Sequence, residues 1–261
     1  MNVYHQEIEK WHIKSSDEPG MHHVIKPLEQ DCQTVNIFRL NLEAGSSYAL
    51  ASGIFEMNPV LIKGKAVISG VALEASLDKF DSFYIPGKSD VQITAKEDAV
   101  FYIGAANCDG VGKPFVRKYD SELPLGEIHQ FHGEGSGKRE VFFTLNPEVP
   151  ASRLICGLTW GADGNWTSWP PHQHENDLEE VYCYFDMEAP KYGLHISYLN
   201  GQSIDDAVIH IVQSSSMVLA PKGYHPTVAT PDTQNTYLWV LASFSSEQRR
   251  YDLAKTDPKF V

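Results

Sequence analysis

The sequence predicts an all-β protein assembled from two copies of one β unit. Three observations support this prediction: short runs that are apolar or alternate in polarity, frequent Gly, Pro, Asn and Asp between them, and an internal repeat. Strands are recognised by apolar residues with a period of two and by turn residues at their ends. No long segment of the 261 residues has a clear 3.6-residue apolar period, so we expect little helix.

Several segments carry the strand pattern clearly, because Val, Ile, Phe and Tyr are enriched in them. The expected strands are residues 36–42, 83–85, 91–94, 100–103, 141–145, 181–185 and 237–241. A hairpin is expected around Asn200-Gly201, since Asn-Gly favours the two positive φ values of a type I′ turn.

An internal repeat relates the two halves of the chain. The pattern of residues 83–102 returns in residues 218–237, at a constant spacing of 135 residues. Each copy has a strand, a turn that contains Pro, a short strand and a strand that contains Tyr, which indicates a duplicated unit. Turn residues dominate the stretch 108–124 between the copies. We therefore expect two domains, residues 1–115 and 116–261.

Composition excludes several classes of partner. The formal net charge is −13 and Lys and Arg form no cluster, so a nucleic-acid binder is not expected. No apolar run reaches the length of a membrane span. The N-terminal residues have neither a basic start nor an apolar stretch, and the four cysteines are widely spaced without a CxxC pair. Reduced thiols and a cytoplasmic protein are expected.

One constellation of residues is typical of a metal site. His172 and His174 lie one residue apart after Trp169-Pro-Pro171, and on an extended backbone their side chains point to the same face. A third imidazole, His225, follows a Pro-Lys-Gly-Tyr turn. Imidazoles with a carboxylate suit Zn²⁺, Mn²⁺, Fe²⁺ or Ni²⁺. The first copy has Asp90 at the position of His225, so only the second copy is expected to hold the ion.

Strand parity favours one of two carboxylates as the remaining ligand. In a continuous strand Glu180, Tyr182 and Tyr184 share one face, whereas Glu179 lies on the apolar face. The first face has the mixed character of a polar cavity lining, so Glu180 is the expected ligand. Glu179 stays an alternative, because the loop after His174 leaves the register open.

Other histidines are weaker candidates. His129-Gln-Phe-His132 is followed by Gly133, Gly135 and Gly137, which predicts a solvated loop. His195 and His210 lie inside apolar strands and are expected to be satisfied core or cavity residues.

Three motifs, residues 164–174, 178–182 and 221–226, resemble the 5-deoxy-glucuronate isomerase family of inositol catabolism. That family is related to the 5-keto-4-deoxyuronate isomerases of pectin breakdown in the cupin superfamily. The resemblance implies a bicupin fold with two tandem, jelly-roll-like β-barrels, of which the second holds the metal. Carried onto this chain, the family's metal ligands are His172, His174, Glu180 and His225.

The resemblance implies a metal-dependent aldose–ketose isomerase that converts 5-deoxy-D-glucuronate to 5-dehydro-2-deoxy-D-gluconate, with zinc as the favoured cofactor. A divalent ion that holds O1 and O2 would stabilise an enediolate while a base moves a proton between carbons. Glu179, Glu175 and a metal-bound hydroxide are candidates for that base. Tyr182, Tyr184 and Tyr224 are candidates for moving the hydroxyl proton. Lys222 is a candidate for holding the substrate carboxylate, with Arg153 as a second choice.

Three alternative functions remain at this point: a 5-keto-4-deoxyuronate isomerase, a cupin dioxygenase and a non-catalytic protein that binds a sugar acid. The expected partner in each isomerase or binding hypothesis is a small sugar acid. Exposed sheet edges predict self-association as a dimer or hexamer.

Overall fold

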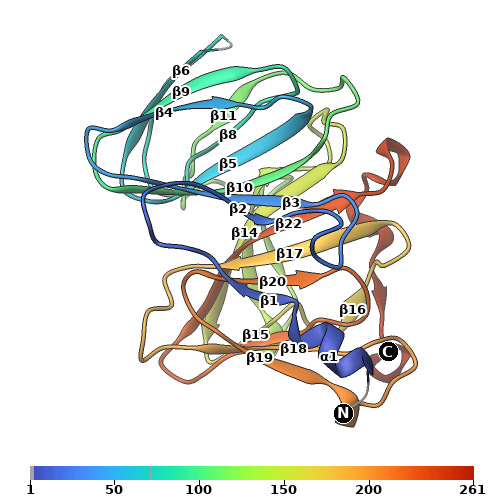
Figure 1. Cartoon of the computed structure of the whole chain (residues 1–261). Coiled ribbons are helices and arrows are strands. Elements are labelled where there is room, and N and C mark those ends of the chain that lie inside the picture. The colour runs from blue at the N-terminus through green and yellow to red at the C-terminus, as the bar shows by residue number, and fades with distance from the viewer. Residues whose placement is uncertain (1–2, 71) are drawn as a thin grey trace.

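The computed structural model describes residues 3–70 and 72–261, and it consists of two similar β units stacked on each other (Figure 1). The predicted all-β class is confirmed. Among these residues, helix is confined to α1 (Val3–Glu9) and to short 3₁₀ turns, which are Gly135–Gly137, Ile204–Asp206, Ser246–Gln248, Tyr251–Leu253 and Pro258–Phe260. In the described part of the chain, no helix has the length and apolar character needed to cross a membrane.

The first unit consists of a large and a small antiparallel sheet. The large sheet has the order β11-β8-β5-β10-β3-β2, with strands β11 (Phe115–Arg117), β8 (Ser82–Tyr84), β5 (Phe55–Lys63), β10 (Ala99–Asn107), β3 (Asn36–Leu42) and β2 (Gly20–Ile25). The small sheet has the order β4-β9-β6-β7, with strands β4 (Ser47–Ala51), β9 (Asp90–Ala95), β6 (Ala66–Gly70) and β7 (Leu73–Leu77).

The second unit repeats this plan, with seven strands instead of six in its large sheet. Its large sheet has the order β1-β20-β17-β22-β14-β13-β12, with strands β1 (His12–Lys14), β20 (Ser216–Ala220), β17 (Leu178–Tyr184), β22 (Gln234–Ser243), β14 (Leu154–Asp163), β13 (Arg139–Leu145) and β12 (His129–His132). The small sheet has the order β15-β21-β18-β19, with strands β15 (Trp166–Thr167), β21 (Thr227–Ala229), β18 (Gly193–Ser197) and β19 (Val208–Val212). A separate pair joins β16 (His172–Gln173) to β23 (Lys255–Thr256).

The internal repeat is confirmed by strand order. Neighbours β8-β5-β10-β3-β2 in the first unit correspond to β20-β17-β22-β14-β13 in the second. The constant spacing of 135 residues is wrong at the last strand of the repeat, however. Tyr102 packs in the layer between the units, whereas Tyr237 packs inside the second unit. Because successive strand residues face opposite sides, the true correspondence is shifted there by one residue.

Three apolar clusters hold the molecule together. One fills the first unit, one lies inside the second unit, and the third lies between the two large sheets. Strand β17 takes part in two of them, because Val181 and Cys183 face the layer between the units while Tyr182 and Tyr184 face the inside of the second. This alternation places the odd and even residues of β17 in different environments.

Residues 3–14 belong structurally to the second unit. Strand β1 pairs with β20 through His12 and Val218, and α1 lies beside the second unit, at the bottom of Figure 1. The expected division between residues 115 and 116 falls inside β11 (Phe115–Arg117), which pairs with β8 of the first unit. We therefore propose that residues 3–14 be counted with the second unit, although they precede the first in the chain.

The expected hairpin at Asn200-Gly201 has a different turn from the one predicted. Strands β18 and β19 do pair, but a long loop with its own 3₁₀ turn joins them. Gly201 has a positive φ of 80°, whereas Asn200 does not lie in the left-handed region, so the type I′ prediction is wrong. The four cysteines are free, and three of them are buried.

Candidate metal centre

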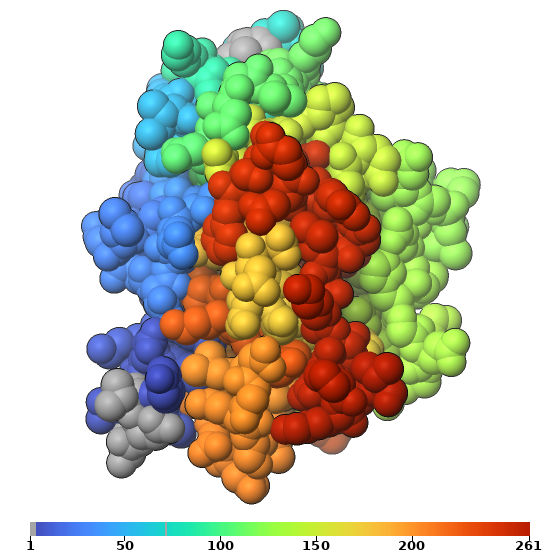
Figure 2. All heavy atoms as spheres, turned by 90° about the vertical axis from the view of Figure 1, so that its right-hand side faces the viewer, coloured from blue at the N-terminus to red at the C-terminus, as the bar shows by residue number. Residues whose placement is uncertain are grey.

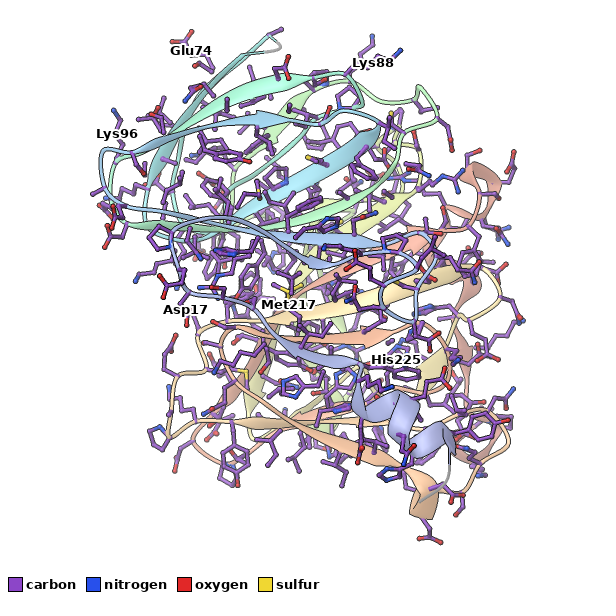
Figure 3. The ribbon with its side chains drawn as sticks, viewed as in Figure 1. Asp17, Glu74, Lys88, Lys96, Met217 and His225 are labelled. Atoms are coloured by element: carbon purple, nitrogen blue, oxygen red, sulfur yellow. The ribbon has the colours of Figure 1, made fainter. Side chains whose placement is uncertain are left out.

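Four side chains from three segments of the second unit converge at one point. His172 and His174 come from β16 and the residue after it, Glu180 from β17, and His225 from the turn before β21. Their ligand atoms all lie within 4.8 Å of one another. In Figure 3, His225 lies in the second unit close to α1. The sequence therefore identified the four residues that the fold brings together.

Local structure explains how each ligand reaches the cluster. Strand β23 pairs with β16, with Thr256 opposite His172, which holds that segment extended. The amides of Asp177 and Leu178 both donate to the carbonyl of His174, so the chain turns back before β17. Gly223 has a φ of 73°, and a Cβ there would collide with the backbone of Tyr198. Only glycine fits this turn without strain.

Backbone carbonyls fix the orientation of all three imidazoles. Nδ1 of His172 lies 3.0 Å from the carbonyl oxygen of Pro170, and Nδ1 of His174 lies 3.2 Å from that of Leu178. Nδ1 of His225 lies 3.1 Å from the carbonyl oxygen of Gly223. Because a carbonyl only accepts, each Nδ1 carries the hydrogen in the neutral ring. Each Nε2 then has a free lone pair, as a metal-binding histidine requires.

The free Nε2 atoms meet a carboxylate, which also offers only lone pairs. Nε2 of His174 and of His225 lie 3.0 Å and 3.1 Å from the same oxygen, Oε2 of Glu180. Nε2 of His225 is buried and has no hydrogen-bond partner among the described residues. Lone pairs facing one another in a buried site need a cation between them. This donor set fits a divalent metal ion.

The electrostatics of the cluster agree with this donor set. Loss of solvation and the nearby His225 ring lower the pKa of His172 to about 3, which favours the neutral ring. Burial alone would raise the pKa of Glu180, but the close approach of the His174 and His225 rings outweighs it and holds that pKa well below its usual range. The glutamate is therefore ionised, as a ligand must be.

Three residues of the cluster, His172, His174 and Glu180, line a cavity of about 220 Å³. The lining residues are His132, Arg139, Trp169, Pro170, His172, His174, Leu178, Glu180, Leu241, Tyr251, Ala254 and Thr256. The C-terminal segment borders this cavity through Tyr251, Ala254 and Thr256. In Figure 2 the segment near residue 175, in gold, is flanked by the red C-terminal residues. A cavity of this size and polarity suits a small polar ligand.

Comparisons with known proteins agree with the geometry of the site. The model of the KduI/IolB family matches residues 10–260. The chain belongs to the KduI/IolB family. It is 33% identical over 205 residues to a 5-deoxy-glucuronate isomerase of Geobacillus kaustophilus, covering 70% of each chain.

Solved structures with a similar fold include a member of the cupin group. An IolB-like protein from Salmonella typhimurium matches with a TM-score of 0.81 at 22% identity, over 96% of this chain and 97% of that chain. A cupin 2 conserved barrel domain protein from Leptotrichia buccalis matches with a TM-score of 0.51 at 11% identity, over 87% and 90% of the two chains. These likenesses support the bicupin fold.

Glu179 lies on the opposite face of β17 from the cluster, as strand parity predicted. Its carboxylate accepts hydrogen bonds from the amides of Gln33, Thr34 and Val35, at 2.6, 2.8 and 3.1 Å. Burial raises the pKa of Glu179 although these hydrogen bonds oppose the shift. The structure does not bring this residue to the cavity, and it fastens the loop before β3 to the second unit.

Tyr184 and Lys222 also lie away from the cavity. The hydroxyl of Tyr184 is 2.9 Å from Nδ1 of His195 and 3.0 Å from the hydroxyl of Thr227, deep inside the second unit. Lys222 forms ion pairs with Glu7 and Asp31, at 2.8 and 3.1 Å. These contacts occupy both side chains.

Sequence reasoning missed three residues that line the cavity, namely His132, Arg139 and Tyr251. His129 and His132, expected in a solvated loop, form strand β12, and His129 is buried. That prediction was wrong because the glycines after His132 form the turn to β13 rather than a long loop. Register places His132 directly opposite Arg139, and Tyr251 comes from the C-terminal segment. Alternation of Gln130 and His132 about Phe131 was the one signal that could have indicated a strand.

Proposed function

We propose that this protein is a metal-dependent isomerase that converts 5-deoxy-D-glucuronate to 5-dehydro-2-deoxy-D-gluconate. One observation carries the proposal: three imidazole Nε2 lone pairs and an ionised carboxylate converge in a cluster, three of whose residues line a small cavity. Membership of the KduI/IolB family and the names of the curated relatives support the choice of reaction.

The proposal includes His172, His174, Glu180 and His225 as the ligands of one divalent ion. Three histidines and one glutamate are a ligand set for zinc, which we favour, and also for manganese, iron or nickel. When bound, the ion supplies a positive charge that polarises a carbonyl and lowers the cost of negative charge on neighbouring oxygens.

The reaction needs no external oxidant. A hydrogen moves from C2 to C1 of the substrate and a proton moves from O2 to O1, so the aldehyde becomes an alcohol and the alcohol a ketone. The protein must hold the open chain with these four atoms near the cluster and limit water around them. Trp169 and Tyr251 provide the large walls that suit this task.

The residues first predicted as catalytic receive supporting roles in the proposal. Glu179 anchors residues 33–35 across the interface of the two units. Tyr184 orients His195 behind the cluster, and Lys222 fastens the turn before His225 to Glu7 of α1. Each acts on the position of the site rather than on substrate.

A cytoplasmic location and self-association are also part of the proposal. Free thiols at all four cysteines fit a reducing compartment. Strand β19 is at the edge of its sheet, and its residues Ile209 and Ile211 are 57% and 62% exposed. An apolar sheet edge of this kind suits contact with a second copy of the chain.

The decisive experiment is metal analysis of protein purified without added metal, followed by NMR of its reaction with 5-deoxy-D-glucuronate. We expect about one metal ion per chain and conversion to the 5-keto acid without oxygen consumption. Protein that carries metal but leaves the substrate unchanged would contradict the proposed reaction.

A further inference from the structure

The cavity beside the ligand cluster contains a guanidinium that forms no ion pair with a carboxylate of the described residues. Among its described lining residues, Arg139 is the one Lys or Arg. Its Nη1 donates to the carbonyls of Trp169 and Gly137, at 3.0 and 3.2 Å. Within residues 3–70 and 72–261, no carboxylate oxygen lies within 4.0 Å of this guanidinium, and Nε and Nη2 have no hydrogen-bond partner. A half-buried arginine with free donors needs an anion.

The other cationic residues considered as carboxylate holders are already neutralised. Arg153 pairs with Asp109 at 3.0 Å, and Lys222 pairs with Glu7 and Asp31. Neither borders the cavity. Arg139 therefore differs from both in its place and in its lack of an ionic partner.

The fold holds Arg139 firmly. It begins β13 and lies opposite His132 of β12 on one side and opposite Gly161 of β14 on the other. A Cβ added at Gly133 would collide with the carbonyl of Gly137 and meet Nη1 of Arg139 at 3.1 Å. The glycine turn thus allows the guanidinium to lie against the backbone, which orients its remaining donors.

We propose that Arg139 binds the carboxylate of the sugar acid, while the aldehyde end of the same molecule lies at the four-residue cluster. This inference rests on the proposed function and adds the residue that selects an acidic sugar. A planar guanidinium matches a carboxylate with two parallel hydrogen bonds, which a hydroxymethyl group cannot accept in the same way. Burial and the charge of Arg139 lower the pKa of the neighbouring His132, so that ring adds no competing cation at neutral pH.

The test compares two substrates in the metal-loaded protein: 5-deoxy-D-glucuronate and 5-deoxy-D-glucose, in which a hydroxymethyl group replaces the carboxylate. For Arg139→Gln we expect kcat/KM on the uronate to fall on the order of 10- to 100-fold, mainly through KM. On the uncharged sugar we expect little change. Arg139→Lys keeps the positive charge but cannot make the two parallel hydrogen bonds of a guanidinium, so it should recover part of the lost kcat/KM.

Controls separate selection of the carboxylate from a structural role. Lys79→Gln removes one positive charge from an exposed ion pair with Asp186 and should leave both substrates unaffected. Equal losses on both substrates, or lower metal content in Arg139→Gln, would show that Arg139 acts only by supporting Trp169. An unchanged kcat/KM on the uronate would also overturn the proposal.

A binding measurement keeps the inference distinct from the reaction. If the wild-type protein does not isomerise the uronate, the proposed function fails, and calorimetry with D-glucuronate then tests the carboxylate site alone. Weaker binding to Arg139→Gln than to the wild type supports the site. Equal binding, or none to either protein, overturns it.

Discussion

The two β units share one strand order but differ in what they enclose. The first unit is filled by aliphatic and aromatic side chains, among them Leu61, Ile68 and Phe101, which are all fully buried. The second unit encloses polar groups beside its apolar ones, including His195 and Asn235, also fully buried. The same topology can therefore enclose either an apolar core or an interior with polar side chains that can form a functional site.

The buried polar groups of the second unit reduce the stability of its fold. His195 Nε2, His210 Nε2 and Ser197 Oγ are buried without a hydrogen-bond partner among the described residues, and such atoms oppose folding. Among the described residues, the first unit has one such atom, Oγ of Ser82 in β8. Its counterpart of the His225 turn places Asp90 on the surface, so it adds stability without a ligand set. Fold and chemistry are thus separable within one chain.

The largest expected effect separates chemistry from folding in the second unit. His174→Ala removes one of the four cluster residues, so we expect loss of bound metal and a fall in turnover of at least about 100-fold, more than loss of an outer partner causes. The circular dichroism spectrum and melting behaviour should remain those of a folded protein. Metal content, turnover and melting are measured together. Retained turnover would refute a reaction centred on this cluster.

The converse experiment changes the first unit. Phe101→Ala creates a cavity in its apolar core, and we expect a loss of about 3–5 kcal/mol in the free energy of unfolding. Metal content and kcat should be unchanged below the melting temperature, because Phe101 lies in the other unit. Chemical denaturation and metal analysis check both. A folded variant that has lost its metal would show that the units are coupled more tightly than their separate cores indicate.

Acid should weaken the second unit through its buried histidines. Burial, followed by the charge of His12, lowers the pKa of His210 to about 4, whereas the unfolded chain titrates near 6.5. The unfolded state binds more protons, so this contribution is complete above about pH 6.5 and is lost as the pH falls towards 4. Its size is up to about 3 kcal/mol.

The measurement compares urea unfolding of the wild type and His210→Gln at pH 7 and pH 4.5. We expect the wild type to lose more stability between these values, since the variant lacks the titrating ring. Equal losses in the two proteins would show that other groups dominate the acid response.

The smallest effect concerns Lys222. Lys222→Met removes ion pairs with Glu7 and Asp31 that are about one-third exposed, and we expect a loss of about 1 kcal/mol or less. We expect kcat/KM on the uronate to change by less than about threefold, because this side chain does not border the cavity. Steady-state kinetics and denaturation check these values. A rise in KM of tenfold or more with kcat unchanged would instead show that Lys222 contacts the substrate.

Local sequence patterns were sufficient to predict the strands and the four residues of the cluster. Each of the seven predicted strand segments overlaps an observed strand, because period-two alternation directly reflects a face that is buried. The spacing of His172 and His174 and the parity of Glu180 also depend only on an extended backbone. Their convergence with His225 was predicted from the repeat, and the ligand atoms do lie together.

Local patterns failed where distant segments meet. Lys222 was expected near substrate because it is close to His225 in sequence, but α1 and the loop at Asp31 provide carboxylates that occupy it. Arg139 has no motif around it, and its place depends on the register between β12, β13 and β14.

By itself, the sequence determined the all-β class, the duplicated unit and the four residues of the cluster, because alternation, turn residues and ligand spacing are properties of neighbouring residues. Only the tertiary structure decided that Glu179, Tyr184 and Lys222 are engaged elsewhere, and that Arg139, His132 and Tyr251 line the cavity. Those positions depend on strand register and on packing of the C-terminal segment across the second unit. Such contacts join residues far apart in the chain, and no local pattern specifies them.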